Sequence, residues 1–168
     1  DISRLSELRF IRVNSGWIET GGLATHAEMV SSPLYLQSAP ALQQACASIG
    51  APQTRVRGTL GGNLANASPA ADTAAPLLAL DAMVVLQSVQ GQRELALSDF
   101  FTAPGKTRLQ PGEFIYCVRF PVPAGRWGSC YFKLGRRQGM SVAVASAAVY
   151  LQLGDDDRIQ IARAAFGS

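Results

Sequence analysis

Residues Thr59 to Asp72 read Thr-Leu-Gly-Gly-Asn-Leu-Ala-Asn-Ala-Ser-Pro-Ala-Ala-Asp and form the most informative segment of this chain. Small residues dominate it and it has no apolar period of its own, so it predicts a loop. Gly61 and Gly62 lack Cβ atoms and allow another molecule to approach the backbone. Four side chains add neutral hydrogen-bonding groups: Thr59, Asn63, Asn66 and Ser68. Together these features predict a ligand-binding loop.

The glycine pair matches neither of the two common nucleotide-binding patterns. The phosphate loop requires G-x-x-x-x-G-K and the Rossmann turn requires G-x-G-x-x-G, and both are absent from this stretch. A helix over residues 72–82 and a strand over residues 83–88 are predicted directly after the loop. Asp72 therefore has two interpretations, a helix N-cap and a ligand contact, and one carboxylate can serve as both.

The flanking segments predict a mixture of hairpins and helices. Residues 10–13 and 17–20 predict a hairpin around Asn14-Ser15-Gly16, and residues 83–88 and 94–97 predict a second one. Apolar residues at steps of three and four predict a helix over residues 41–49 that ends at Gly50. A surface loop is predicted over residues 102–112. Four more strands are expected at residues 114–120, 129–134, 142–153 and 158–165.

Composition restricts the class of protein. The 168 residues are 48% hydrophobic and 16% charged, which is typical of a globular protein with a core. The net charge of +3 and two short arginine pairs, Arg55 with Arg57 and Arg136 with Arg137, give little support to nucleic-acid binding. These pairs are expected to flank an anionic cofactor or a protein partner, or to be solvated. No apolar run is long enough for a transmembrane segment.

Cysteine and histidine usage argues against a metal site. Cys46, Cys117 and Cys130 have no C-x-x-C spacing and are too few for a four-cysteine iron-sulfur cluster. Their apolar settings predict small core residues in a reducing compartment, so we expect a cytoplasmic location. His26 is the only histidine and is expected to be an exposed polar residue. We therefore expect no catalytic residue and no metal ligand in this chain.

With these residues in view, the chain resembles the FAD-binding subunit of the molybdenum-containing hydroxylases, the family of xanthine dehydrogenase and aerobic carbon monoxide dehydrogenase. The order and spacing of several blocks carry the resemblance, and they cover nearly the whole chain. The blocks are Thr25–Val30, Gln53–Gly58 running into the Thr-Leu-Gly-Gly-Asn stretch, Ser98–Phe101, Leu109–Ile115 and Tyr131–Arg137.

The resemblance implies an α+β fold in two parts. Residues 1–121 would form the second lobe of the FAD-binding domain, a mixed, partly antiparallel sheet with packed helices. Residues 122–168 would supply the first strands of an antiparallel C-terminal domain. Members of the family carry the loop for the FAD pyrophosphate in a lobe upstream of this part, so we expect this chain to be an internal piece. Gly21-Gly22 is interpreted as a strand end and a turn, not as that loop.

The resemblance also implies which residues bind FAD. The stretch and the helix start would line the cofactor, and Ile115 and Lys133 would lie near the isoalloxazine ring. A lysine ammonium there would stabilise negative charge on the reduced ring. The alternatives are an ordinary solvated strand lysine for Lys133 and a core residue for Ile115. The expected cofactor-binding set is Thr59, Gly61, Gly62, Asn63, Asn66, Asp72, Ile115 and Lys133.

The resemblance implies a redox subunit of an oxidoreductase. FAD would pass electrons from iron-sulfur clusters on a partner to an external acceptor such as NAD, oxygen or a quinone. The [2Fe-2S] clusters and the molybdenum cofactor would belong to partner chains or domains. One alternative is a non-catalytic scaffold lobe that does not retain flavin. Another is a flavin oxidase of the vanillyl-alcohol type, for which a lone His26 is poor evidence as a flavin tether.

Overall fold

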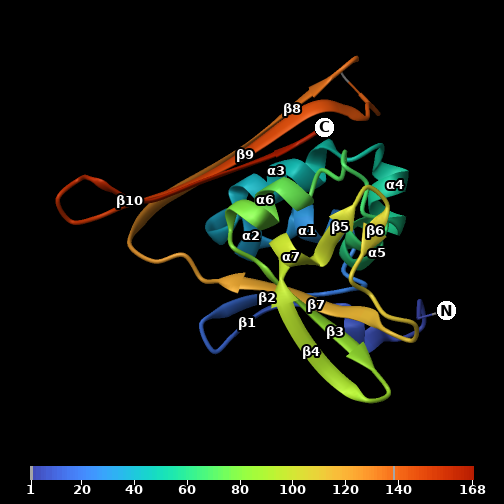
Figure 1. Ribbon diagram of the computed structural model, residues 1–168. Coiled ribbons are helices and arrows are strands. Elements are labelled where there is room, and N and C mark those ends of the chain that lie inside the picture. The colour runs from blue at the N-terminus through green and yellow to red at the C-terminus, as the bar shows by residue number, and fades with distance from the viewer. Residues whose placement is uncertain (1, 138) are drawn as a thin grey trace.

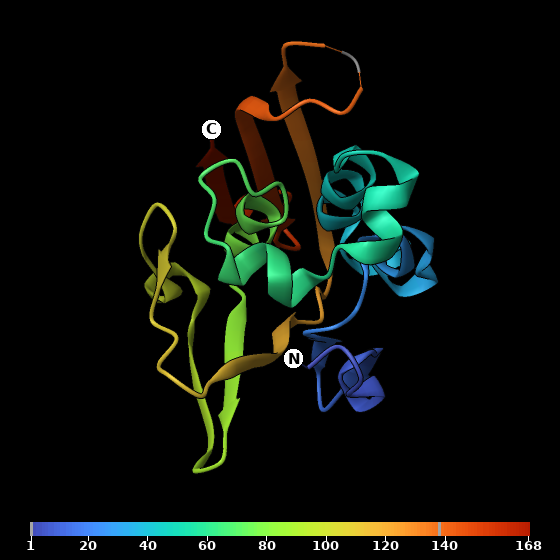
Figure 2. The same ribbon diagram turned by 90° about the vertical axis from the view of Figure 1, so that its right-hand side faces the viewer.

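The computed structural model describes residues 2–137 and 139–168, and in it a layer of helices lies between two antiparallel sheets (Figure 1). The larger sheet carries the N-terminal hairpin, and the smaller one is built from the last three strands of the chain. Turning the molecule by 90° shows the same order of layers (Figure 2). The helices therefore bury their apolar faces against both sheets.

The larger sheet has five strands in the order β1-β2-β7-β3-β4. Neighbouring strands within it pair antiparallel. Both predicted hairpins are confirmed, β1 with β2 and β3 with β4. Ser15 and Gly16 have positive φ angles of 49° and 82° in the first turn, as a two-residue hairpin turn requires. The strands are β1 Ile11–Asn14, β2 Trp17–Gly21, β3 Met83–Ser88, β4 Gly91–Ala96 and β7 Phe114–Pro121.

The smaller sheet has three strands in the order β10-β9-β8. Side chains of β8 alternate between half-buried and exposed, because successive residues of a strand point to opposite faces. Its inner face, which includes Ser129, Tyr131 and Lys133, packs on the helical layer. The strands are β8 Arg126–Gly135, β9 Ala143–Leu153 and β10 Ile159–Gly167. With both sheets antiparallel and helices packed between them, the predicted α+β class is confirmed.

The helices are short, and proline begins three of them. Pro33, Pro40 and Pro52 occupy the first turn of α2, α3 and α4, where a missing N–H costs no hydrogen bond. The elements are η1 Ser6–Leu8, α1 His26–Ser31, α2 Pro33–Ser38, α3 Pro40–Ser48, α4 Pro52–Arg57, α5 Leu60–Ala65, α6 Ala74–Ala79 and α7 Leu97–Phe100. None of the helices in the described residues is long and apolar enough to cross a membrane.

Two loop predictions are corrected. The first half of the Thr59–Asp72 stretch is the helix α5, because Leu60 and Leu64, one turn apart, are both fully buried. The predicted surface loop over residues 102–112 contains a small hairpin of β5 Phe101–Ala103 and β6 Lys106–Thr107.

The core lies between the sheets and the helices. Its largest fully buried side chains include Tyr35, Phe100 and Phe120. Cys46 and Cys117 are buried free thiols, as expected, but the prediction that Cys130 is a core residue is wrong. Cys130 lies on the outer face of β8, where alternation exposes it.

Candidate functional site

The two glycines of α5 lie on different faces of the helix, Gly62 on the exposed face and Gly61 on the buried one. Gly62 is exposed, and a Cβ built there would come within 4 Å of one described atom, Thr59 Oγ1, at 3.0 Å. Thr59 caps the helix, since its Oγ1 accepts a hydrogen bond of 3.1 Å from the Gly62 N–H. The backbone at Gly62 is therefore open to a ligand from outside.

Gly61 faces inward and packs on Gly22. The Gly61 N–H donates to the Gly22 carbonyl at 2.9 Å, and a Cβ on Gly61 would lie 2.7 Å from that oxygen. Gly22 in turn donates to Tyr116 in β7 at 2.8 Å. Gly21 ends β2 and Gly22 begins the following turn, which confirms their interpretation as a strand end and a turn. The two glycines bring α5 directly against the ends of β2 and β7, two inner strands of the larger sheet.

The two asparagines of the stretch have different surroundings. Asn63 is half-buried, and its Oδ1 accepts a hydrogen bond of 2.6 Å from the Thr73 hydroxyl. Asn66 is exposed at the C-cap of α5, where its backbone N–H donates to Gly62 at 3.1 Å. Asn63 therefore ties α5 to the start of α6, while the Asn66 side chain lies on the surface.

Asp72 does not cap a helix, so that interpretation is wrong. Thr73 occupies the N-cap of α6 in a helical conformation and makes no capping bond with its side chain. The Asp72 carboxylate instead accepts a hydrogen bond of 2.7 Å from the Tyr131 hydroxyl at Oδ1 and one of 2.7 Å from Lys133 Nζ at Oδ2. Both carboxylate oxygens of Asp72 therefore bind side chains of β8, Tyr131 and Lys133, and neither caps α6.

Lys133 is not a solvated strand lysine. Its side chain is 11% exposed and that of Asp72 is 9% exposed, so the ion pair is largely buried. Nζ also donates to the Ser48 carbonyl at 3.2 Å, at the C-terminal end of α3. A lysine ammonium has three N–H donors, and these two bonds use two of them.

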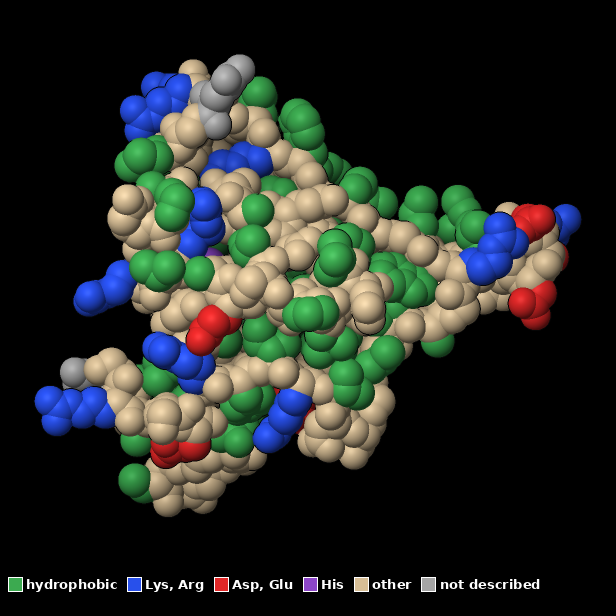
Figure 3. All heavy atoms as spheres, turned by 180° about the vertical axis from the view of Figure 1, so that it is seen from behind, with side chains coloured by type: hydrophobic (Ala, Val, Ile, Leu, Met, Phe, Trp, Pro, Cys, Tyr) green, Lys and Arg blue, Asp and Glu red, His purple; other side chains and the backbone are tan. Residues whose placement is uncertain are grey.

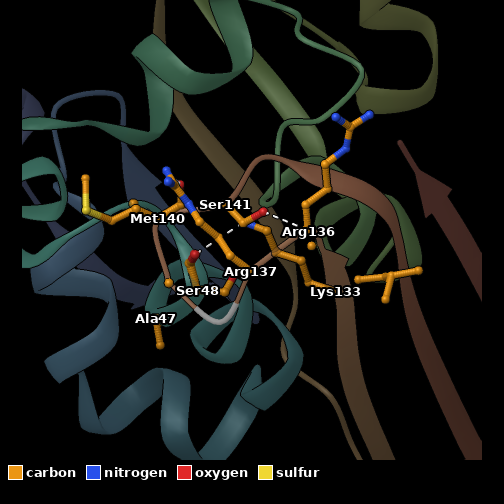
Figure 4. Close-up of a pocket in the computed structure, with 11 residues that line it drawn as sticks. Ala47, Ser48, Lys133, Arg136, Arg137, Met140 and Ser141 are labelled. Atoms are coloured by element: carbon orange, nitrogen blue, oxygen red, sulfur yellow. Dashed lines mark hydrogen bonds between the residues drawn. The ribbon is translucent and has the colours of Figure 1, made fainter.

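Lys133 lines a cavity of about 530 Å³ between the end of α3 and the turn that follows β8 (Figure 4). Figure 4 shows Arg136 and Arg137 on the same turn as Ser141, whose hydroxyl accepts from the Arg136 backbone N–H at 3.0 Å. Three cations therefore border this cavity, which suits an anionic ligand. Lys and Arg side chains also gather along the edge of the molecule that carries α4 (Figure 3).

Ile115 lies apart from Lys133 in the fold. It is 4% exposed in β7 of the larger sheet, whereas Lys133 belongs to β8 of the smaller one. A Cβ on Gly22 would lie 2.1 Å from the Ile115 carbonyl oxygen, so the Ile115 backbone lies close to the α5 contact. The core interpretation of Ile115 agrees with its burial, and its position near a flavin ring stays a prediction.

Sequence reasoning missed Tyr131 as a site residue. Tyr131 and Lys133 are two residues apart in a predicted strand, so the alternation of a strand could have placed them on one face. Nothing in the sequence, however, indicates that this face meets Asp72, which is 59 residues upstream of Tyr131.

His26 is buried, which corrects the expectation of an exposed residue. Its side chain is 3% exposed at the first position of α1, and Nδ1 has no hydrogen-bond partner among the described residues. The ring packs under Gly58, where a Cβ would lie 3.0 Å from its Cδ2 atom. Burial lowers the pKa of His26 to about 4, although the nearby Asp72 carboxylate acts in the opposite direction. The imidazole is therefore neutral near pH 7.

Acid is expected to destabilise the protein through His26. Its pKa is about 4 in the folded state and 6.5 as the ordinary value, so the unfolded state takes up the proton first as the pH falls. The contribution of neutral His26 to the free energy of unfolding is fully present above pH 6.5 and is lost as the pH falls towards 4. By pH 5 the free energy of unfolding should have fallen by about 1–2 kcal/mol from this cause. Urea unfolding at pH 7 and pH 5 measures this, and His26→Gln should show a smaller loss. Equal losses in both proteins would contradict it.

Comparison with known proteins shows the family of this chain. Residues 1–123 match the family model described as the FAD binding domain in molybdopterin dehydrogenase. The nicotinate dehydrogenase FAD-subunit of Eubacterium barkeri is 35% identical over 158 residues, which cover 92% of this chain and 53% of that protein. A 6-hydroxypseudooxynicotine dehydrogenase complex subunit alpha of Paenarthrobacter nicotinovorans is 38% identical over 164 residues, which cover 97% and 55%.

A solved structure shows the same fold. Carbon monoxide dehydrogenase from Hydrogenophaga pseudoflava, in a form that lacks the Mo-pyranopterin moiety of its molybdenum cofactor, aligns with a TM-score of 0.93 at 32% identity. The alignment covers 99% of this chain and 57% of the other. The chain thus spans a little over half the length of the relatives it matches. It belongs, as the resemblance predicted, to the family of FAD-binding domains of the molybdopterin dehydrogenases.

Proposed function

We propose that this chain binds FAD as part of the flavoprotein subunit of a molybdenum hydroxylase. The observation that carries the proposal is the Lys133 ammonium, which is held by Asp72 and Ser48 at the wall of the cavity of about 530 Å³. FAD, when bound, supplies one- and two-electron redox chemistry. The lining of this cavity fits such an anionic group, because Lys133, Arg136 and Arg137 border it. Gly62 does not line the cavity, and its open backbone on α5 is a separate point of access.

The eight predicted residues divide into three roles in this proposal. Gly62 and Asn66, which are exposed on α5, are the direct contacts with the cofactor. Thr59, Gly61 and Asn63 hold α5 in place, and Ile115 supports it from the sheet. Asp72 orients Lys133, and Lys133 would hold the flavin ring through the N–H that remains after its bonds to Asp72 and Ser48. The hydrogen bonds of Thr59, Gly61, Asn63 and Asp72 support the holding and orienting roles. The exposure of Gly62 and Asn66 supports their role as contacts.

The proposal also covers electron transfer by the whole protein of which this chain is part. Electrons would arrive from [2Fe-2S] clusters on an iron-sulfur subunit, and the molybdenum cofactor would oxidise the substrate on another subunit. NAD, oxygen or a quinone would accept the electrons. We also propose that residues 1–121 and 122–168 belong to two domains, and that the protein is cytoplasmic. No observation favours the scaffold alternative, since the open Gly62 and the buried Lys133 match a retained flavin.

The experiment that tests the proposal is a visible absorption spectrum of the intact protein that contains this chain. Denaturation should then release the chromophore for identification by mass. Bound FAD is the expected result. A colourless protein that also takes up no added FAD would overturn the proposal.

Lys133→Met is expected to lower the reduction potential of the bound flavin. The substitution keeps much of the side-chain length but removes the positive charge that stabilises the reduced ring. It also leaves Asp72 without its buried counter-ion, which should cost about 3 kcal/mol of stability. A redox titration against a dye measures the potential, with Lys106→Met on the exposed hairpin as the control. An unchanged potential would remove Lys133 from the flavin site.

A further inference from the structure

We propose that Tyr131 is a positioning residue that determines how much positive charge Lys133 presents to the cofactor. The inference rests on the proposed function, because it assumes that a flavin occupies the cavity beside Lys133. Tyr131 is expected to act through Asp72 and to make no contact with the flavin itself.

Three side chains form the Asp72–Tyr131–Lys133 triad. The Tyr131 hydroxyl donates to Oδ1 of Asp72 and Lys133 Nζ donates to Oδ2, both at 2.7 Å. Each carboxylate oxygen therefore has its own donor. Tyr131 and Lys133 lie on the same face of β8, while Asp72 comes from the segment between α5 and α6. The triad thus joins the smaller sheet to the segment that follows the glycine pair.

The strand that carries the triad is held in register against α3. Ser129, Tyr131 and Lys133, alternate residues of β8, bond to Ala41, Gln44 and Ser48, which are three and four residues apart in sequence. The distances are 3.3 Å from Ala41 N to Ser129 Oγ, 2.9 Å from Tyr131 N to Gln44 Oε1, and 3.2 Å from Lys133 Nζ to the Ser48 carbonyl. This repeat matches one face of a helix to one face of a strand. The backbone therefore fixes where Tyr131 and Lys133 meet Asp72.

The Tyr131 hydroxyl remains a hydrogen-bond donor over the whole physiological range. Burial raises the pKa of Tyr131 above its ordinary value, and the hydrogen bond to the Asp72 carboxylate raises it further. The phenol thus keeps its proton and stays neutral, so it donates a hydrogen bond to the Asp72 carboxylate and adds no negative charge beside it. It draws part of the carboxylate charge to Oδ1, so that Asp72 neutralises less of the charge on Lys133.

Tyr131→Phe tests this role in the intact protein, with its partner chains present. The substitution removes one hydroxyl, and the unshared Asp72 charge should then cancel more of the Lys133 charge. We expect the equilibrium between reduced and oxidised flavin to shift about threefold to tenfold towards the oxidised form. A tenfold shift corresponds to about 30 mV for a two-electron couple.

The matched control is Tyr150→Phe. Tyr150 is buried in β9 of the same sheet, and its hydroxyl donates to Gln152 at 3.3 Å. The variant therefore loses a hydrogen-bonded tyrosine hydroxyl of the same sheet that has no part in the triad. The flavin potential of this variant should equal that of the unmodified protein, even if its stability falls.

Asp72→Asn provides a second variant with the opposite expected sign. Removal of the carboxylate charge leaves Lys133 without its counter-ion, so the flavin equilibrium should shift towards the reduced form. This shift tests the step from Asp72 to Lys133. Adding Tyr131→Phe to Asp72→Asn should leave the potential of Asp72→Asn unchanged, because the hydroxyl then has no carboxylate charge to share, and a further shift would overturn the positioning role. Loss of FAD from Asp72→Asn would make Asp72 a direct cofactor contact and overturn the positioning role.

The outcomes separate this inference from the proposed function. An unmodified protein without FAD would overturn both. FAD in the unmodified protein together with an unchanged potential in Tyr131→Phe would overturn the positioning role alone, and a loss of stability without a change in potential would have the same meaning. Opposite shifts in the two variants, with Tyr150→Phe unchanged, are the result that the triad predicts.

Discussion

Gly62→Val is expected to abolish retention of FAD while the protein remains folded. The backbone at Gly62 is exposed, and a Cβ there would come within 4 Å of only Thr59 Oγ1 among the described atoms. Valine therefore requires only a small shift of the Thr59 side chain in the free protein, but its methyl groups would occupy the space through which a cofactor approaches α5. Valine has a higher helix propensity than glycine, so the substitution carries no propensity cost in α5.

The measurement is the ratio of flavin to protein absorbance after purification, together with a thermal unfolding curve. Gly128→Val is the matched control, because Gly128 lies on the outer face of β8 and a Cβ there would have no described atom within 4 Å. The control should keep its flavin. Undiminished FAD content in Gly62→Val would show that α5 does not contact the cofactor.

Gly22→Ala is expected to have the largest effect on stability. A Cβ at this position would lie 2.1 Å from the Ile115 carbonyl oxygen, a backbone atom of a strand in the middle of the sheet. Neither side can move without breaking the hydrogen bond from Gly22 to Tyr116 or the one from Gly61 to Gly22. We expect a loss of about 3 kcal/mol or more in the free energy of unfolding.

Urea unfolding measures this loss, and Gly128→Ala provides the control for the same substitution in open space. FAD should be lost as a secondary effect, because α5 rests on Gly22 through Gly61. A Gly22→Ala protein as stable as the control would contradict the packing described here. The two variants therefore distinguish Gly62, which is expected to contact the cofactor, from Gly22, which is expected to support α5.

Much of the fold follows from local patterns in the sequence. The turn Asn14-Ser15-Gly16 predicts the first hairpin, and apolar steps of three and four predict α3. These elements are determined by interactions between residues that are close in sequence. The helix α5 was not predicted, because its small residues show no clear apolar period. Its two leucines, Leu60 and Leu64, are recognised as one helix face only when their burial is known.

The candidate site followed only partly from the sequence. The glycine pair and Lys133 could be selected by their resemblance to a family, but their separate roles could not. Gly61 and Gly62 are identical neighbouring residues, so the sequence does not distinguish them. Only the contact with Gly22 shows that Gly61 is the one that faces inward. The burial of His26 likewise depends on packing beneath Gly58.

The hairpins, the α+β class and the family can be predicted without the structure, because turn chemistry, apolar periodicity and the order of motifs are properties of the amino-acid sequence. The bonds of Asp72 to Lys133 and Tyr131, in place of a helix cap, depend instead on how the chain folds. A carboxylate accepts hydrogen bonds from whichever donors the fold brings within reach. Here those donors come from a strand about 60 residues away, at the junction of the smaller sheet and the helical layer.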